Sequence, residues 1–270
     1  MTEIYRFTPG TTPILVSVPH AGTYVPAEIA ARMTDDALAL PDTDWHVERL
    51  YDFAASLGIG MIVATHSRYV IDLNRDPSGK PLYPGADNTE LVPTTTFNRD
   101  HIYRPGGGLD DAEVEQRVVQ YWKPYHDRLA QELAVLRERF GMAVLWDAHS
   151  IPSQVPRFFS GRLPDLNLGS ARGASAAQEL VAAVMESFEQ NDGFSKVRDG
   201  RFTGGYITRH FGKPETGVHA LQLELAQAAY MDEAPPYRFE EARAAPMREL
   251  LSGTMETVVG WAQERARVRA

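Results

Sequence analysis

The stretch Pro13-Ile-Leu-Val-Ser-Val-Pro19 is a short, β-branched apolar run that ends at a proline, and His20-Ala-Gly22 follows it directly. A run of this kind predicts a buried strand over residues 13–19. The residue at its end matters because ligands of α/β sheets gather beyond the carboxyl ends of the strands. His20 is therefore a candidate for a site at that edge of a sheet.

Further apolar runs have the length and composition of buried strands. Asn74-Arg75 follows one of them, Asp147-Ala-His149-Ser150 follows another, and Glu224 lies inside a third. The chemically active residues thus gather at predicted strand ends, where one edge of a sheet would bring them together. These strands are predicted over residues 61–65, 69–73, 142–146 and 218–225.

Apolar side chains spaced three or four residues apart predict amphipathic helices between the strands. Thr43 or Asp44 stands where the N-cap of the first helix belongs, and Pro124 should kink or break the second before Gly141 ends it. Strands that alternate with helices predict an α/β sheet with helices on both faces. The long stretch between them without any period predicts a functional loop. The helices are predicted over 44–57, 111–140, 174–188 and 240–269, the loop over 76–109, and a single domain over 1–270.

The 270 residues carry 27 basic and 36 acidic side chains, which gives a net charge of −9. This balance disfavours nucleic acid and anionic membranes as partners, although a local arginine cluster could still bind a small anionic substrate. The chain has no cysteine, so a transition-metal site must use His, Asp or Glu. The N-terminus lacks the pattern of a signal peptide, and no window approaches the ~20 apolar residues of a membrane span. We expect a soluble, cytoplasmic protein.

His20 and His149 each follow a predicted strand and have small neighbours, which leave room for a ligand at the imidazole. Either residue alone would be read as an ordinary histidine, but two at the strand ends of one sheet favour a metal site. Catalytic zinc takes a third protein ligand and keeps its fourth position for water. Asp44 and Asp147 are the candidates, with Asp44 preferred. Asp44 could instead cap a helix, and Asp147 could instead accept a hydrogen bond from a ligand histidine. Two weaker candidate ligands are His46 and His66.

Glu224 is a lone carboxylate in the apolar run 218–225. Alternation along a strand places it on one face with Gln222, opposite the leucines. A partly desolvated glutamate beside a metal ion has the basicity to take a proton from bound water, so Glu224 is the candidate general base. The alternative is a polar edge that faces solvent.

Several arginines near the predicted strand ends could bind an anionic substrate, because a guanidinium binds a carboxylate through two parallel hydrogen bonds. Arg68 and Arg75 flank one strand, and Asn74 precedes Arg75. The alternative for each is a surface salt bridge. Weaker candidates of the same kind are Arg104 and Arg209, the latter in a glycine-hinged segment that could act as a flap.

Five separated segments carry a common pattern: Ser17-Val-Pro-His-Ala-Gly22, Asp44-Trp-His-Val-Glu-Arg-Leu-Tyr51, Ser67-Arg-Tyr-Val-Ile-Asp-Leu-Asn-Arg-Asp-Pro77, Trp146-Asp-Ala-His-Ser150 and Gln222-Leu-Glu224. In type and order they resemble the motifs of the N-formylglutamate amidohydrolase family, over nearly the whole chain. That family hydrolyses N-formyl-L-glutamate to formate and L-glutamate, the last step of one route of histidine degradation. It is similar in turn to zinc carboxypeptidases and aspartoacylase-type deacylases, which implies a mixed, mostly parallel central sheet flanked by helices on both faces.

The resemblance also implies roles for single residues. His20 and His149 would be metal ligands, and Glu224 would be the base. The relatives place their carboxylate ligand three residues after the first histidine, where this chain has Thr23, so Asp44 is the expected third ligand. The ligand types favour Zn²⁺, with Mn²⁺, Co²⁺ or Fe²⁺ as alternatives. The substrate would be held by Arg68 near the scissile carbonyl and, at its two carboxylates, by Asn74 and Arg75 with Arg104 or Arg209.

Two other functions fit the same residues. One is a deacylase of another N-acyl amino acid or a carboxypeptidase-like hydrolase, which a substrate panel would separate because a formyl pocket excludes larger acyl groups. The other is a non-catalytic sensor of an acidic ligand, which the complete set of His20, His149 and Glu224 disfavours.

Overall fold

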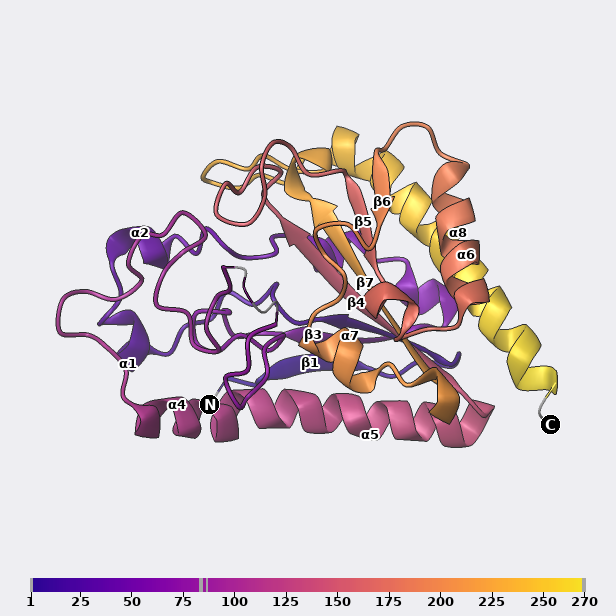
Figure 1. The fold of residues 1–270 in the computed structure, drawn as a ribbon, viewed down its shortest axis with the longest axis horizontal. Coiled ribbons are helices and arrows are strands. Elements are labelled where there is room, and N and C mark those ends of the chain that lie inside the picture. The colour runs from indigo at the N-terminus through magenta and orange to yellow at the C-terminus, as the bar shows by residue number, and fades with distance from the viewer. Residues whose placement is uncertain (1, 83–84, 86, 269–270) are drawn as a thin grey trace.

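One mixed sheet organises the protein, whose computed structural model describes residues 2–82, 85 and 87–268. In these residues seven strands lie in the order β1-β3-β2-β4-β7-β5-β6 (Figure 1). Neighbours pair in parallel except at β1/β3 and β5/β7, which are antiparallel. The predicted α/β fold with a mixed, mostly parallel sheet is therefore confirmed. The strands are β1 Tyr5–Thr8, β2 Ile14–Val18, β3 Gly60–Ala64, β4 Ala143–Ile151, β5 Leu166–Gly169, β6 Lys196–Arg198 and β7 Val218–Ala226.

Helices cover both faces of the sheet, as predicted (Figure 1). The long helix α5 packs leucines against β2 and β4 on one face, and α6 and α8 pack on the other. No helix among the described residues combines the length and the apolarity needed to cross a membrane. The helices are α1 Ala27–Ala30, α2 Asp35–Leu38, α3 Val47–Leu50, α4 Asp111–Arg117, α5 Lys123–Phe140, α6 Gln178–Glu189, α7 Tyr206–Phe211 and α8 Glu241–Val268.

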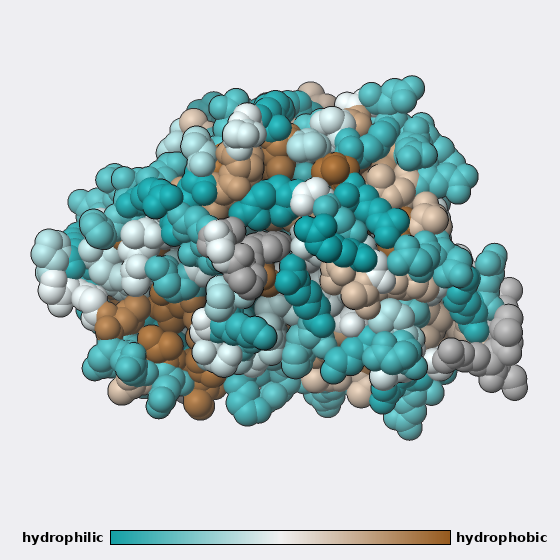
Figure 2. All heavy atoms as spheres, viewed as in Figure 1, coloured by the Kyte–Doolittle hydropathy of each residue, from teal (hydrophilic) through white to brown (hydrophobic). Residues whose placement is uncertain are grey.

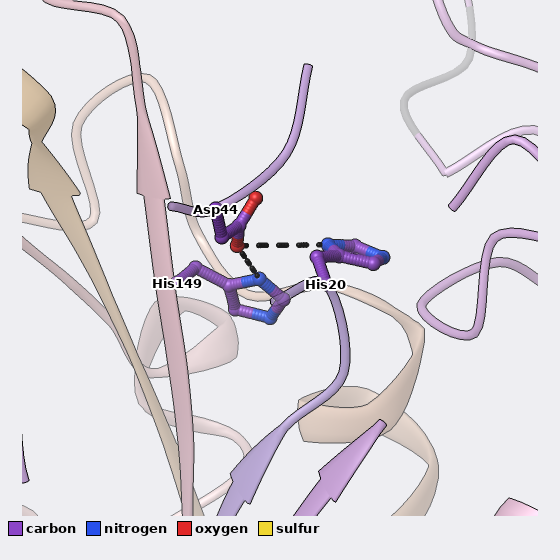
Figure 3. A group of neighbouring side chains, drawn as sticks. All are labelled: His20, Asp44 and His149. Carbon is purple, nitrogen blue, oxygen red and sulfur yellow. Dashed lines mark hydrogen bonds and ion pairs between the residues drawn. The ribbon is translucent and has the colours of Figure 1, made fainter. Parts of the chain in front are cut away.

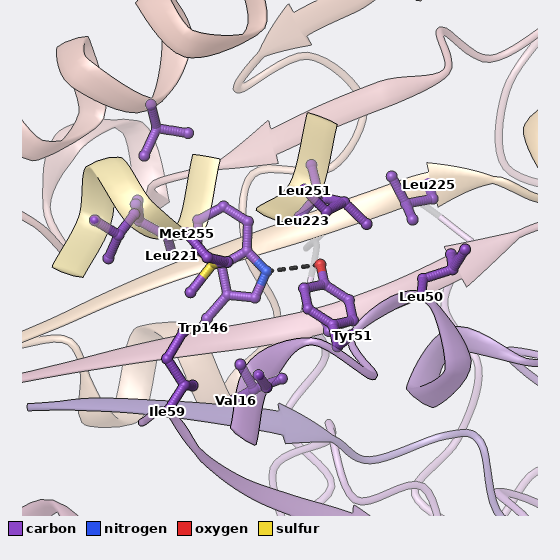
Figure 4. Close-up of a cluster of buried hydrophobic side chains, with 14 of the residues drawn as sticks. Val16, Leu50, Tyr51, Ile59, Trp146, Leu221, Leu223, Leu225, Leu251 and Met255 are labelled. Carbon is purple, nitrogen blue, oxygen red and sulfur yellow. Dashed lines mark hydrogen bonds between the residues drawn. The ribbon is translucent and has the colours of Figure 1, made fainter. Parts of the chain in front are cut away.

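The larger core lies between the sheet and α8, and Trp146 is at its centre (Figure 4). The Trp146 side chain is fully buried, and its Nε1 donates a 2.8 Å hydrogen bond to the hydroxyl of Tyr51. Leu221, Leu223 and Leu225 of β7 point into this core, as the alternation of β7 predicts. The opposite face of β7 is thereby left for Gln222 and Glu224. Around this core the visible surface is largely hydrophilic (Figure 2).

The strand predicted over 69–73 is wrong, because this segment is irregular although it is buried. Side chains of the helix beneath it satisfy its carbonyl groups in place of a neighbouring strand. Arg117 donates to the Val70 carbonyl at 2.9 Å, His126 Nε2 lies 2.7 Å from the Leu73 carbonyl, and Trp122 donates to the Arg75 carbonyl at 3.1 Å. An apolar run therefore marked burial here, not strand pairing.

The helix predicted over 44–57 is also wrong. Only α3 and a 3₁₀ turn at Ala54–Leu57 form within it. His46, directly before α3, has a left-handed φ of 63°, which a continuous helix does not allow. Asp44 makes no cap and turns its carboxylate toward the histidines instead.

The other predicted helices form with changed boundaries. A π-helical turn at Val118–Trp122 joins α4 to α5, and Pro124 follows it in the first turn of α5. The helix is therefore widened before the proline and not broken by it. Gly141 ends α5 with a φ of 78°, as predicted. The helix predicted from 174 begins at Gln178, and Arg269 of the predicted C-terminal helix lies outside the described residues.

Two further results bear on the site. The predicted loop 76–109 contains no helix or strand in its described residues, and residues 83, 84 and 86 lie outside them. The strand predicted over 142–146 is longer than expected, because β7 pairs with β4 as far as Ile151. Asp147 and His149 therefore lie within β4 and not after it. The elements that were not predicted are β1, β5, β6, α1, α2 and α7.

We predict a pH-dependent loss of stability from His126. Burial lowers its pKa from 6.5 to about 3, so the folded protein keeps this imidazole neutral while the unfolded chain takes up a proton. Between about pH 6.5 and about pH 4.5 the free energy of unfolding should fall by roughly 2 kcal/mol from this group. Urea unfolding at both pH values checks the loss. His126→Gln, whose amide can still donate to the Leu73 carbonyl, should show a shallower pH dependence, and an unchanged dependence would contradict the assignment.

Candidate metal centre and active site

Three side chains from distant parts of the chain meet where β2 ends. His20 lies two residues beyond β2, His149 lies in β4, and Asp44 lies before α3. One ligand atom from each lies within 4.8 Å of the others (Figure 3). Asp44 Oδ2 is 3.0 Å from His149 Nδ1 and 3.7 Å from His20 Nδ1. All three residues are buried, and together they could hold a metal ion.

The outer nitrogen of each imidazole faces a further carboxylate. His20 Nε2 is 2.8 Å from Asp72 Oδ1, and His149 Nε2 is 3.1 Å from Asp147 Oδ2. When a metal ion takes the Nδ1 lone pair of a histidine, the ring proton sits on Nε2, where a carboxylate can hold it. The two Nδ1 atoms near Asp44 are the candidate ligand atoms. Asp44 therefore stands on the inner side of the group, and Asp147 on the outer side.

The donor set fits a divalent cation. Asp44 Oδ1 is buried and makes no hydrogen bond to a described residue. Arg68 Nη1 lies 3.5 Å from it, so this oxygen still has lone pairs that a cation could take. Burial raises the pKa of Asp44, but hydrogen bonds with His149 and His20 outweigh it and hold the pKa well below its usual value. A carboxylate that stays ionised beside two imidazole nitrogens is the ligand type that zinc and similar ions prefer.

Glu224 lies beside this group on the neighbouring strand. In the parallel pairing of β4 with β7, it is directly opposite His149, and Gln222 is opposite Asp147. Gln222 donates a 3.1 Å hydrogen bond to Glu224 Oε2. Only 7% of Glu224 is exposed, so the solvent-facing alternative is wrong. Burial raises the pKa of Glu224 to about 8, so its ionised form is a stronger base than an exposed glutamate.

Asp72 organises the polar residues around the histidines. This fully buried carboxylate lies 2.7 Å from Arg68 Nη2 and 3.8 Å from Arg75 Nη1, and it accepts a 2.9 Å hydrogen bond from the Asn74 backbone N–H. One side chain thus fixes His20 and the predicted substrate-binding segment together. The sequence analysis did not single out Asp72, although a lone acidic residue in an apolar run was a usable signal.

Close packing positions the Asn74 side chain. Its Oδ1 accepts a 2.8 Å hydrogen bond from the Ile207 N–H, and its Nδ2 lies 3.2 Å from Asp147 Oδ2. A Cβ at position 205 would lie 2.3 Å from Asn74 Nδ2, so Gly205 is required for this approach. Gly205, in the glycine-hinged segment that precedes Arg209, thus serves packing and not only flexibility.

His20, Asp44, Asn74, His149 and Glu224 line one pocket that is partly open to solvent. Arg68, Arg75 and Arg201 are the arginines among its described lining residues, and sequence analysis did not find Arg201. The structure does not bring Arg104 or Arg209 to the pocket. Arg104 is half exposed and pairs with Asp35, whereas Arg209 donates to the carbonyl of Gly204 and to Thr203.

The two weaker candidate ligands also lie outside the pocket and its metal group. His46 Nε2 is 2.7 Å from the Tyr237 carbonyl, and the His66 ring packs between Tyr24 and Tyr121. Both have structural partners that account for them.

The mixed α/β fold carries a pocket in which a candidate metal centre adjoins a buried glutamate, an arrangement that fits a metal-assisted hydrolase. A family model for N-formylglutamate amidohydrolase matches residues 12–231. The chain belongs to the N-formylglutamate amidohydrolase family.

Curated relatives and a solved structure agree with this assignment. The chain is 46% identical over 265 residues to an N-formylglutamate deformylase of Pseudomonas aeruginosa, covering 98% of this chain and 99% of the relative. It is 43% identical over 265 residues to the enzyme of the same name from Pseudomonas putida, with the same coverage. The crystal structure of an N-formylglutamate amidohydrolase from Ralstonia eutropha superposes with a TM-score of 0.81 at 24% identity, covering 97% of this chain and 98% of that one. That likeness concerns the fold.

Proposed function

We propose that this protein hydrolyses N-formyl-L-glutamate to formate and L-glutamate, with a divalent metal ion held by His20, Asp44 and His149. The observation that carries the proposal is one pocket in which a buried His–Asp–His group adjoins a buried glutamate and an Asn-Arg pair. Membership of the family supplies the substrate. Zn²⁺ suits the ligand types best, and Mn²⁺, Co²⁺ and Fe²⁺ are the alternatives.

In this reaction the amide C–N bond breaks, and the elements of water add across it. A bound divalent ion would supply an acidified water and polarise the formyl oxygen. Glu224 takes a proton from the attacking water and delivers it to the leaving nitrogen. Arg68, 3.5 Å from Asp44 Oδ1, is placed to stabilise negative charge on the formyl oxygen.

Asn74 and Arg75 suit the α-carboxylate of the substrate. Asn74 Nδ2 lies 2.9 Å from His149 Nε2, so this pair is next to the metal group, as a carboxylate next to the scissile amide requires. Arg75 is already oriented by two hydrogen bonds to Thr89, to its carbonyl and its hydroxyl, at 3.2 and 2.7 Å. Binding therefore costs little ordering of its side chain.

The test is formate release by the purified protein loaded with zinc. We expect turnover of N-formyl-L-glutamate and little turnover of N-acetyl-L-glutamate, because the larger acyl group must fit beside the metal ligands. Removal of the metal with a chelator should abolish turnover, and added Zn²⁺ should restore it.

Other outcomes of this assay would change the proposal. Equal turnover of the acetyl substrate would indicate a general deacylase. Tight binding without turnover in metal-loaded protein would indicate a sensor of acidic ligands. Full activity in metal-free protein would contradict the metal dependence.

A further inference from the structure

Arg201 is a charged residue of the pocket to which the roles above give no task. It lines the pocket together with Phe158 and Phe202. Its Nε donates a 2.6 Å hydrogen bond to the Phe158 carbonyl, and its guanidinium carbon lies 5.9 Å and 5.3 Å from the centres of the Phe158 and Phe202 rings. The guanidinium is therefore held at the pocket wall by fixed partners, as a preorganised anion site requires.

Aromatic rings separate Arg201 from the metal group. The guanidinium carbon of Arg68 lies 4.9 Å from the centre of the Phe97 ring, and that ring lies 5.2 Å from the ring of Phe158, which adjoins Arg201. Arg68 itself adjoins Asp44. The pocket thus has one guanidinium beside the metal group and another farther along an apolar wall.

The charges of the neighbouring residues leave this wall attractive to an anion. Asp87 is the carboxylate that lines the pocket here, and it is paired with Arg99 at 2.6 Å and with Arg157 at 3.0 Å. Two guanidiniums compensate its charge, so Asp87 does not offset Arg201. The aromatic neighbours lower the local dielectric, which strengthens the attraction between Arg201 and a bound carboxylate.

N-formylglutamate carries two carboxylates at different distances from its amide. The α-carboxylate adjoins the scissile bond and suits Asn74 and Arg75, whereas the other lies at the far end of the side chain. Arg104 and Arg209 lie outside the pocket, and the role proposed for Arg68 places it at the reacting carbonyl.

We propose that Arg201 binds the side-chain carboxylate of the substrate and makes the enzyme selective for acidic N-formyl amino acids. This inference rests on the proposed function. Phe97, Phe158 and Phe202 flank the aliphatic part of the substrate side chain and exclude water from the ion pair. A substrate carboxylate forms an ion pair with Arg201 that an uncharged side chain cannot form, which disfavours uncharged substrates.

The experiment compares two substrates that differ only in that carboxylate, N-formyl-L-glutamate and N-formyl-L-glutamine. Arg201→Gln should lower kcat/KM for N-formyl-L-glutamate by about 10- to 100-fold. It should change kcat/KM for N-formyl-L-glutamine by no more than about threefold. Arg201→Lys, which keeps the charge, should retain part of the preference. Arg75→Gln should lower kcat/KM for both substrates, because both carry the α-carboxylate that Arg75 binds.

Arg172→Gln is the matched control, because Arg172 is exposed and outside this pocket. This variant should leave kcat/KM for both substrates unchanged. Equal losses for the two substrates in Arg201→Gln, or no loss for the glutamate substrate, would overturn the inference. A wild-type protein that releases no formate would contradict the proposed function instead. In that case Arg201 can still be tested by calorimetry of L-glutamate and L-glutamine binding. Arg201→Gln should then lower the affinity for L-glutamate and leave the affinity for L-glutamine unchanged.

Discussion

Replacement of Glu224 by Gln should reduce kcat for N-formylglutamate by about 10²- to 10⁴-fold, the range that general acid–base catalysis contributes. The amide fills the same space but cannot accept the proton from water. KM and metal content should change little, because Glu224 belongs neither to the His–Asp–His group nor to the Asn-Arg pair. Steady-state kinetics of formate release, together with metal analysis of the same sample, check both expectations.

Glu132→Gln provides the matched control for this substitution. Glu132 is also a glutamate with 7% exposure, and it pairs with Arg128 at 3.0 Å on α5, outside the pocket. Its amide variant should keep normal kcat. Near-normal turnover in the Glu224 variant would remove Glu224 from the mechanism, because no buried base would then be needed at this position.

The second large effect concerns the third metal ligand. Asp44→Ala should lose tightly bound metal on dialysis and lose activity with it, because one of three ligand side chains is gone. Asp147→Asn should weaken metal binding by only about 10- to 100-fold, the usual effect of a partner that orients a ligand histidine. Competition with a chromophoric zinc chelator measures both affinities without reference to catalysis.

Thermal unfolding with and without zinc gives an independent readout of the same comparison. Zinc should stabilise wild-type protein and the Asp147 variant, since a ligand that binds only the folded state raises its stability. It should not stabilise the Asp44 variant. Tighter zinc binding by the Asp44 variant than by the Asp147 variant would reverse the two roles.

Local patterns predicted those parts of the fold that depend on neighbours in sequence. Val16 and Ile62 lie in short, mostly apolar runs, and Leu221 lies in a run in which polar residues alternate with leucines, so local patterns revealed these strands. The same reasoning failed for Tyr69–Leu73, which is equally buried but irregular. The carbonyls of Val70 and Leu73 bond to side chains of a helix more than 40 residues away, and no local pattern reports those partners.

For the candidate site, the sequence by itself determined which chemical groups are available: two histidines near predicted strand ends, a lone glutamate within a strand, an Asn-Arg pair and no cysteine. These follow from residue type and alternation. Only the tertiary structure placed Asp44 inside the histidine group and Asp147 outside it. Only the tertiary structure showed that Arg201 lines the pocket and that Arg104 and Arg209 do not. Such choices depend on where loops meet and which way side chains turn, and long-range packing fixes both.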